Sequence, residues 1–362
     1  MPTLAAPPKA ESPSKGRVTP VPGHVDQQPV PAQTQPGPAD VEYEYIPEDS
    51  EIHVGSADLR LPHVETPEAA QPLSFIWSYA IPIIVFHLLA PLAFTKYFFS
   101  WTGVALVPIG NYIFCSLGIG AGFHRLLTHR SYKCPKWFEH TLAILGTCSL
   151  QQAPARWVMV HRMHHQHSDH QPDPHTPLVN WFWGHMGWVM FQNRDLRSMA
   201  NYEKYAKDLL TDPFYMKLER NGMWFIIGMI QSVIIFLLGL GAGYGMYGYG
   251  PVALQYGLSI LMWGVVIRTI YSWHVTWGVN SISHMFGYRN YETDENSRNN
   301  WVIGLATNGE GWHNNHHADP RSAAHGFHQW WELDITYLSI RFFKLIGIVT
   351  EIVPIRRKME NQ

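Results

Sequence analysis

The run MWFIIGMIQSVIIFLLGL at residues 223–240 contains no charged residue. As an α-helix it would rise about 27 Å, close to the ~30 Å hydrocarbon core of a bilayer. A helix also satisfies its own backbone hydrogen bonds, which lipid cannot do. Three other long apolar runs occur at residues 74–94, 104–123 and 252–273, and the last of them contains one charged residue, Arg268. We therefore expect an all-α integral membrane protein with four transmembrane helices.

The distribution of Lys and Arg predicts how these helices are oriented. Short stretches around residue 96 and at 241–250 join the runs in pairs, which predicts two hairpins. These stretches hold one basic residue and none, whereas residues 124–222 hold 12 and the chain from residue 268 onward holds 9. Basic residues concentrate on the cytoplasmic side of membrane proteins. We expect both termini and a helical cap there; a soluble four-helix bundle, the alternative, gives no reason for this asymmetry.

The first 72 residues differ in composition from the rest of the chain. They hold 14 of the 26 prolines and no long apolar run, which predicts a disordered tail at 1–72. We assign a membrane domain to 73–350 and a C-terminal tail to 351–362. The run 141–150 is too short to span a bilayer and is expected at the interface or in the cap. A net charge of -2 gives no sign of the basic surface that nucleic-acid-binding proteins carry.

The chain has 21 histidines, and their spacing predicts a metal site. HRMHH at 161–165 and HNNHH at 313–317 both read HxxHH, and positions i, i+3 and i+4 share one face of a helix. HRLLTH at 124–129 directly follows the second apolar run. Its histidines are five residues apart, about 140° around an ideal α-helix, so they must straddle a metal or the helix must be distorted.

The ligand type narrows the metal. Imidazole suits Zn, Cu, Ni and Fe, whereas Mg and Ca prefer oxygen ligands. A structural zinc site uses four ligands, and these three motifs supply eight histidines, which argues for two metals. An all-histidine di-iron site in a membrane protein fits better than the Glu and ExxH pairs of soluble di-iron bundles.

These motifs, with NSISH at 280–284 and GEGWHNNHH at 309–317, resemble the membrane fatty acyl desaturases of the stearoyl-CoA (delta-9) type. The resemblance covers about residues 74–350 and implies a di-iron centre. One iron would be bound by His124, His129, His161, His165 and His316. The other would be bound by His164, His284, His313 and His317, with Asn280 reaching it through a water. Asn280 and His284 are four residues apart and so share a helical face.

The resemblance also implies the reaction. It would be insertion of a cis double bond, at delta-9, into a saturated acyl chain, with O2 as co-substrate and electrons from an external donor such as cytochrome b5 or ferredoxin. Four residues would line the bend of the acyl tunnel: Gln151, Trp157, Thr276 and Trp277. The animal acyl-CoA branch has an Arg-Asp pair where this chain has Met159 and Val160, which cannot bind a phosphate. The acyl chain could therefore be linked to CoA or to a lipid.

Two other functions stay open. A membrane hydroxylase would share the di-iron site, although the motif spacing and the NxxxH segment argue against it. A non-catalytic metal transporter or sensor is expected to carry ionisable residues along its helices rather than histidine clusters at one end. His87 and Arg268 lie in predicted spans and are expected either to function or to pack against a helix end. Other histidines are expected to hydrogen-bond around the ligands or to lie at the surface: His167, His170, His175, His185, His325 and His328.

Overall fold

The computed structural model describes residues 63–355. The predicted tail therefore lies outside the described residues up to residue 62, and the C-terminal tail does so from residue 356. Residues 63–72 pack against the helical part of the chain: the Val64 amide donates to Leu178 O at 3.3 Å, and Ala70 is buried beside Val179 and Trp183. The packed structure thus begins before the predicted domain boundary at residue 73.

Between residues 63 and 355, four helices are long and apolar enough to cross a membrane. The first, Trp77–Phe94, comprises α1 (Trp77–Leu89) and η2 (Ala90–Phe94), and the second, Trp101–Thr128, comprises α2 (Trp101–Gly110) and η3 (Asn111–Thr128). The third is α8 (Met223–Tyr247). The fourth, Pro251–His284, comprises α9 (Pro251–Leu261), η6 (Met262–Ile267), α10 (Arg268–Ser281) and η7 (Ile282–His284).

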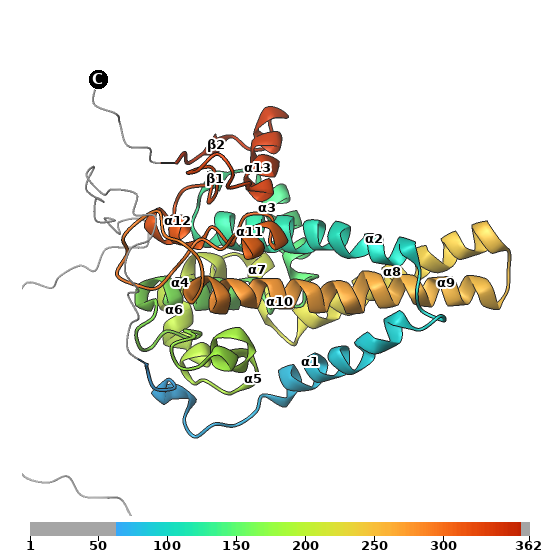
Figure 1. Ribbon diagram of the computed structural model, residues 1–362, viewed down its shortest axis with the longest axis horizontal. Helices are drawn as coiled ribbons and strands as arrows, with labels where there is room; N and C mark the ends of the chain where they lie inside the picture. The colour runs from blue at the N-terminus through green and yellow to red at the C-terminus, as the bar shows by residue number, and fades with distance from the viewer. Residues whose placement is uncertain (1–62, 356–362) are drawn as a thin grey trace, which may run out of the picture. The chain divides into compact units, whose positions relative to one another are not determined.

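The second and fourth helices are longer than the sequence predicted. They contain 28 and 34 residues, so they extend about 40 and 50 Å, beyond the ~30 Å hydrocarbon core. The predicted ends at 123 and 273 were set by the polar residues that follow. In the structure those residues stay helical because other helices bury them. Figure 1 shows α10 and the continuation of α2 running into the mass of shorter helices, so the second and fourth helices carry His124 and His284 to that end.

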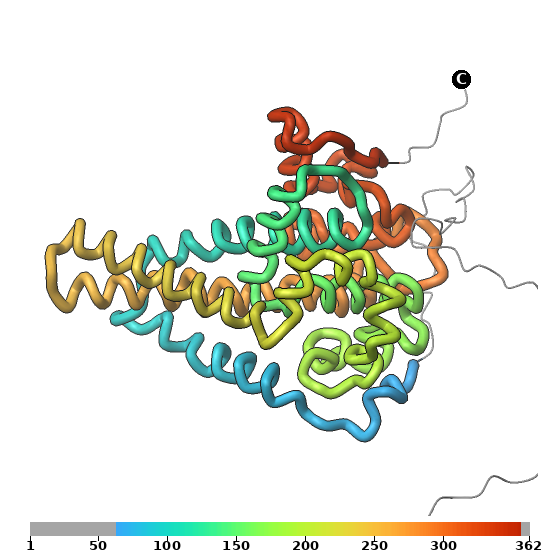
Figure 2. Tube along the Cα trace, turned by 180° about the vertical axis from the view of Figure 1, so that it is seen from behind, coloured from blue at the N-terminus to red at the C-terminus, as the bar shows by residue number. Residues whose placement is uncertain are grey.

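The third and fourth helices lie side by side, with α8 packed along α9 (Figures 1 and 2). The predicted turn at 241–250 is shorter, because α8 continues to Tyr247 and only Gly248–Gly250 remain outside both helices. Gly243 lies inside α8, where a Cβ atom would come within 2.8 Å of Ala253 O. Small residues of this kind allow membrane helices to approach closely.

The first two spans are not packed in the same way. α2 packs against α9, η6 and α10, whereas α1 contacts η6 and α5 (Trp188–Met190). Figure 1 shows α1 diverging from α2 towards the shorter helices. This divergence leaves α1 as one wall of a cavity that reaches the histidines.

The shorter helices gather at one end of the four spans (Figure 1), and together with the strands we call them the cap. Its larger helices are α3 (Lys136–Thr147), α4 (Pro154–His167), α6 (Met199–Leu210), α7 (Pro213–Glu219), α11 (Trp301–Ala306), α12 (His313–Ala318) and α13 (Ile335–Leu345). Short turns are η1 (Glu68–Ala70), η4 (Trp183–Gly187) and η5 (Asp195–Arg197). The strands β1 (Tyr132–Lys133) and β2 (Glu351–Ile352) pair antiparallel, with Tyr132 opposite Ile352.

Residues 141–147 of the run at 141–150 form the second half of α3, and residues 148–150 follow it as a turn. This helix packs across η3 in the largest group of buried apolar residues. Two glycines make this crossing close: a Cβ on Gly118 would lie 2.3 Å from Gly146 N. Leu142, beside them, is 1% exposed. The run is therefore a core helix of the cap, one of the two predicted locations, and it braces the span that ends in the first histidine motif.

Candidate metal centre

Nine buried or half-buried histidines converge in two groups at the cap end of the spans. The first group is His124, His129, His161, His165 and His316, and the second is His164, His284, His313 and His317. Within each group one ring nitrogen of every residue lies within 4.8 Å of all the others. The structure therefore brings together all nine predicted histidines, divided as the family resemblance implies. The groups are adjacent, since the rings of His165 and His317 stack with centroids 4.5 Å apart.

The first group points Nε2 atoms at one another. His316 Nε2 lies 3.0 Å from His124 Nε2 and 2.9 Å from His165 Nε2, and His165 Nε2 lies 3.1 Å from His161 Nε2. Neutral imidazoles carry one proton each, so such a cluster cannot satisfy every nitrogen by hydrogen bonds between its members. Its nitrogen lone pairs converge on one point.

The second group has the same arrangement. His313 Nε2 lies 3.1 Å from both His284 Nε2 and His317 Nε2. The Nε2 atoms of His164, in this group, and His129, in the first, are buried without a hydrogen-bond partner. A buried polar nitrogen without a partner is costly, and one metal ion in each group would satisfy both.

The winding of η3 explains how His124 and His129 share a site despite their spacing. This segment is a π-helix, in which hydrogen bonds join residues five apart. The His129 amide donates to His124 O at 3.2 Å, and the Thr128 hydroxyl donates to Phe123 O at 2.8 Å. The wider turn brings the two rings to a centroid separation of 5.0 Å. The predicted helix distortion is thus present.

The two HxxHH motifs lie on helices, as their spacing predicts. HRMHH falls in the last turns of α4, whose Pro154 occupies the favoured first turn. HNNHH opens the six-residue helix α12, and its Asn315 is held by Asn290 and Asn299, each 2.8 Å from Asn315 Oδ1. A helix this short has little intrinsic stability. Side-chain hydrogen bonds therefore fix the direction of its three histidines.

The residues fit bound transition-metal ions. For a metal–nitrogen bond of about 2.1 Å, neighbouring ligand nitrogens at roughly 90–110° are about 3.0–3.4 Å apart, close to the spacings of 2.9–3.1 Å found here. Nine imidazoles in two groups suit metals that prefer nitrogen ligands over oxygen. The part of the chain that the structure describes can therefore bind metal at two adjacent sites.

Carboxylates contact the opposite ring nitrogens of three of these histidines. His164 Nδ1 lies 3.0 Å from both oxygens of Asp173, His284 Nδ1 lies 2.9 Å from Asp169 Oδ2, and His124 Nδ1 contacts Glu310 Oε2. A carboxylate that accepts the Nδ1 proton leaves the Nε2 lone pair free and raises its basicity. These acids therefore orient His164, His284 and His124 for metal binding.

Burial sets the charge of the site. It holds the pKa of six histidines outside the spans well below the usual value, so they are neutral near pH 7 as ligands must be: His129, His161, His165, His313, His316 and His317. Burial also opposes ionisation of Glu310, but the Arg125 guanidinium and His124 outweigh it and lower the pKa of that carboxyl to about 2. Arg125 is itself buried between Glu310 and Asp334.

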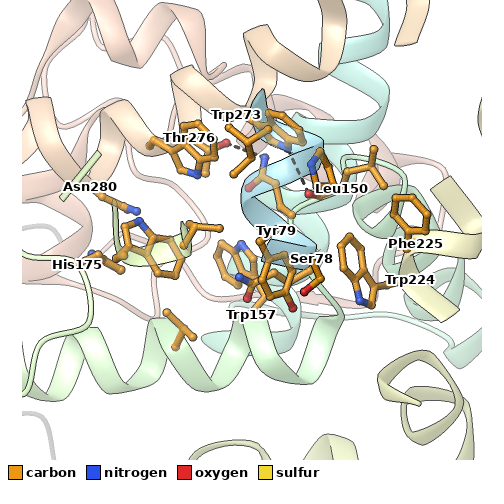
Figure 3. A pocket seen from close by; sticks show the side chains of 18 of the residues that line it. Ser78, Tyr79, Leu150, Trp157, His175, Trp224, Phe225, Trp273, Thr276 and Asn280 are labelled. Carbon is orange, nitrogen blue, oxygen red and sulfur yellow. Dashed lines mark hydrogen bonds between the residues drawn. The ribbon is translucent and has the colours of Figure 1, made fainter. Parts of the chain in front are cut away.

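A mostly apolar cavity reaches the histidines (Figure 3). It encloses about 860 Å³ with its open mouth included and is lined by residues of α1, α4, α8 and α10. His175 and Asn280 lie at one end and Trp224 and Phe225 at the other. All four predicted tunnel residues line it, namely Gln151, Trp157, Thr276 and Trp277, together with the proposed ligand His161. Asn280 also lies on the cavity wall.

The middle of the cavity is held by polar contacts. Gln151 Nε2 donates to Thr276 Oγ1 at 3.0 Å, and Thr276 donates to Ser272 O at 2.8 Å. Trp157 faces them and lies beside the first histidine group, with ring centroids 5.0 Å from His161 and 5.9 Å from His124. An extended apolar molecule in this cavity would therefore pass between these residues next to the histidines.

His175 and His325 were expected to hydrogen-bond around the ligands or to lie at the surface. Both are buried, and they join two further clusters that could hold a metal, His164 with Asp173 and His175, and His124 with Glu310 and His325. Sequence reasoning missed the three acids of these surroundings, namely Asp169, Asp173 and Glu310. Asp169 and Asp173 follow the second motif as DxxxD, which is the only local signal for them. Glu310 stands three residues before His313, an ExxH spacing, yet its carboxylate contacts His124.

Two expectations for the spans can also be compared with the structure. His87 Nε2 lies 2.9 Å from His274 Nε2, and His274 Nδ1 lies 2.9 Å from His185 Nε2. These contacts join α1, α10 and η4, and none of the three histidines belongs to either histidine group. Arg268 contacts the end of α3, so it packs against a neighbouring helix end, one of the two roles expected for it.

Comparison with known proteins gives a consistent result. Residues 99–338 match the family model described as fatty acid desaturase. The chain is 38% identical to an sn-1 stearoyl-lipid 9-desaturase of Synechocystis, covering 82% of this chain and 86% of that protein. It is 36% identical to an sn-2 palmitoyl-lipid 9-desaturase of Nostoc, covering 79% and 93%. It is also 35% identical to an acyl-CoA 5-desaturase of Anemone leveillei, covering 70% and 73%.

Proposed function

The chain belongs to the fatty acid desaturase family, and from this we propose that it inserts a cis double bond at delta-9 into an acyl chain carried on a membrane lipid. It is an oxidoreductase. The observation that carries the proposal is a cavity of about 860 Å³, its open mouth included, that is apolar along most of its wall and is lined by His161 of the first histidine group.

We propose that the two histidine groups bind one iron each. His124, His129, His161, His165 and His316 would hold the first, and His164, His284, His313 and His317 the second, with Asn280 acting through a water. The bound irons would supply the O2-dependent oxidation that no side chain can perform. Overall, the acyl chain loses two hydrogens, and O2 with two electrons and two protons becomes two waters. A separate protein such as cytochrome b5 or ferredoxin would supply the electrons.

The chain's own residues position the substrate. Gln151, Thr276 and Trp157 occupy the middle of the cavity beside the first histidine group, and there they would bend the acyl chain so that one carbon pair faces the metals. Trp273, Trp277 and the apolar residues of α1 would exclude water from the reacting carbons. Holding the reacting atoms within about 1 Å of the productive geometry is worth on the order of a hundredfold in rate.

Two observations favour a lipid-linked substrate. The relatives from Synechocystis and Nostoc are named as lipid desaturases, and the buried Met159 and Val160 offer no contact for the phosphates of CoA. A CoA-linked substrate is the second candidate, because the relative from Anemone is named as an acyl-CoA desaturase.

We propose that the spans form two membrane hairpins with the cap on the cytoplasmic side. The asymmetry of Lys and Arg supports this orientation. The contact of α8 with α9 supports the second hairpin, while the first would be looser because α1 diverges from α2.

The test is to express the full chain in cells that cannot make this double bond. We expect a cis-9 monounsaturated acid by gas chromatography and mass spectrometry, with a brief fatty acid label appearing in unsaturated form first in glycerolipids and not in acyl-CoA. Elemental analysis of the purified protein should give about two irons per chain. A hydroxylated product would replace this proposal by a hydroxylase, and bound metal without any product would favour a non-catalytic protein.

A further inference from the structure

Arg268 is a cation buried in the fourth span. Its residue is 0% exposed, and within the described part of the chain its guanidinium donates only to neutral oxygens. Nη1 donates to Cys148 O at 3.1 Å, Nη2 to Gln231 Oε1 at 3.2 Å and Nε to Gly264 O at 3.2 Å. A buried charge without a carboxylate partner is expensive in lipid. Other groups must therefore stabilise the charge of Arg268.

The contact with Cys148 places this charge at the end of α3. Cys148 is the C-cap of that helix, where carbonyl groups lack partners and the helix dipole is negative. The ring of Phe114 lies 4.7 Å from the guanidinium carbon and adds a cation–π contact. The helix end and the aromatic ring together provide the negative potential that stabilises Arg268.

The segment that follows Cys148 has a strained backbone. Leu150 and Gln152 both adopt positive φ, 58° and 77°, although neither is glycine. Gln151, which donates to Thr276 in the middle of the cavity, stands between them. Residues other than glycine keep such conformations only where surrounding contacts hold them. The side chain that is proposed to bend the substrate therefore projects from backbone that will relax if released.

Three residues of the fourth span hold this segment. Arg268 donates to Cys148 O, Trp273 Nε1 donates to Leu150 O at 3.2 Å, and Thr276 accepts from Gln151. Figure 3 shows the last two contacts from neighbouring turns of α10. Of the three, only Arg268 lies outside the cavity wall, so it acts on the segment without facing the substrate.

We propose that Arg268 is a positioning residue that determines the position of the double bond through Gln151. This rests on the proposed function. Arg268 holds the end of α3, which is where the strained segment begins. The position of that end determines how far the Gln151 amide reaches towards Thr276. A shift of about one ångström there is comparable to one methylene of the acyl chain, so releasing the segment moves the bend relative to the metals.

The experiment compares Arg268→Gln, Arg268→Lys and wild type in cells that cannot make the double bond themselves. Arg268→Gln should give a second monounsaturated product displaced by one or two carbons, with turnover lowered about 10- to 100-fold. Arg268→Lys keeps the charge but loses the fork of donors, so it should restore part of the original selectivity. Ser259→Ala is the matched control, because Ser259 is a buried polar residue of the same span that contacts Phe98 O far from the segment.

Two further measurements distinguish a local displacement of the segment around Gln151 from a general loss of folding. Hydrogen exchange should become faster in peptides covering residues 147–153 of Arg268→Gln and stay unchanged at 161–165, and metal content should equal that of wild type. If Arg268→Gln does not yield folded protein, Arg268→Lys carries the test by the same readouts. A single wild-type product from a slower variant, or unchanged exchange at 147–153, would overturn the inference. Failure of wild type to desaturate would instead overturn the proposed function.

Discussion

Glu310 shows how a single carboxylate can organise a histidine site. It accepts from His124 Nδ1 on one side and from Arg125 Nη2 at 2.6 Å on the other, while Arg125 also pairs with Asp334 at 2.9 Å. The chain of contacts runs from the metal-facing imidazole to a fully buried aspartate. Because each partner is fixed by the next, the His124 ring has one orientation in which Nε2 faces the first group.

Replacing Glu310 by Gln tests this orientation. The amide is similar in size but lacks the charge that raises the basicity of His124, so metal affinity should fall about 10- to 100-fold. The measurement is iron retained after dialysis of purified protein against a chelator. Glu203→Gln, at an exposed position on α6, is the control and should retain iron like wild type. Equal retention by Glu310→Gln would mean that His124 is oriented by other contacts.

Trp157 tests the bend of the cavity. Its ring lies between Phe123, at 5.9 Å, and His161, at 5.0 Å, so Trp157→Ala should widen the cavity next to the first histidine group. We expect turnover to fall on the order of a hundredfold and the product to spread over neighbouring carbons. Mass spectrometry locates the double bond. His164→Ala provides the contrast, since loss of a ligand should abolish turnover and reduce bound metal; a Trp157→Ala variant with wild-type rate and position would contradict the proposed bend.

Eight of the nine histidines were predictable from their spacing in the sequence, but their surroundings were not. HxxHH spacing places three imidazoles on one face of any α-helix that carries it. In contrast, Glu310 lies 186 residues from His124 in sequence, and Asp169 lies 115 from His284, so no local pattern joins them. His284 and Asn280 were found only through the family resemblance, because an isolated histidine and amide have no metal-binding signature.

At the level of elements, the ends of helices were harder to predict than their existence. Hydropathy located all four spans, but the second and fourth extend beyond the predicted ends because the cap buries the polar residues that mark a surface elsewhere. The π-helical winding of η3 was only one of two expectations. A spacing of five residues can also be accommodated by an undistorted helix whose two histidines straddle the metal. Gly118 of η3 packs closely against Gly146 of α3. This contact fixes the second span just before His124, where the π-helical winding is found.

The contact between α4 and α7 predicts that the stability of the fold depends on pH. Glu219, at the end of α7, accepts from the Ala155 and Arg156 amides at 2.7 and 3.2 Å at the start of α4. Burial raises the pKa of Glu219 from 4.5 to about 7. The folded protein therefore binds this proton more tightly than the unfolded chain, and this contribution to stability is fully present below about pH 4.5 and is lost as pH rises through 7.

We expect wild type to lose on the order of 2–3 kcal/mol of stability from this group between pH 5 and pH 8. Glu219→Gln keeps an oxygen acceptor for the two amides but cannot ionise, so its stability should change less over the same range. The measurement is thermal unfolding in detergent at both pH values for the two proteins. If wild type instead gains stability relative to Glu219→Gln as the pH rises, Glu219 is ionised in the fold and the predicted sign is wrong.

At the scale of the whole molecule, the cavity depends on elements distant in sequence. Residues of α1, α4, α8 and α10 line it, and the diverging path of α1 makes room for it (Figures 1 and 3). Composition and periodicity predict each of these helices separately. They do not predict that α1 leaves α2 and packs near α5, which depends on the fit of residues from several elements.

The start of the packed structure gives the last prediction. Residues 1–60 carry none of the proposed ligands and no long apolar run, so deleting them should leave activity and stability nearly unchanged. Deleting residues 1–72 removes the Val64 contact with Leu178 and the buried Ala70, as well as the bond from the Arg194 amide to Ala69 O at 2.9 Å. These contacts fix the loop and turn around Val179 and Trp183, which lead into the cavity residues Trp188 and Val189.

The longer deletion should therefore lower the melting temperature by several degrees and reduce turnover, whereas the shorter one should do neither. Both variants are compared with wild type by thermal unfolding in detergent and by fatty acid analysis of the expressing cells. A matched pair of substitutions distinguishes loss of packing from shortening of the chain. These are Ala70→Asp at the buried position and Glu68→Ala at an exposed position of the same turn. If the 1–60 deletion inserts normally and yet makes no product, the segment before residue 61 takes part in function, for which docking of the electron donor would be the first role to test.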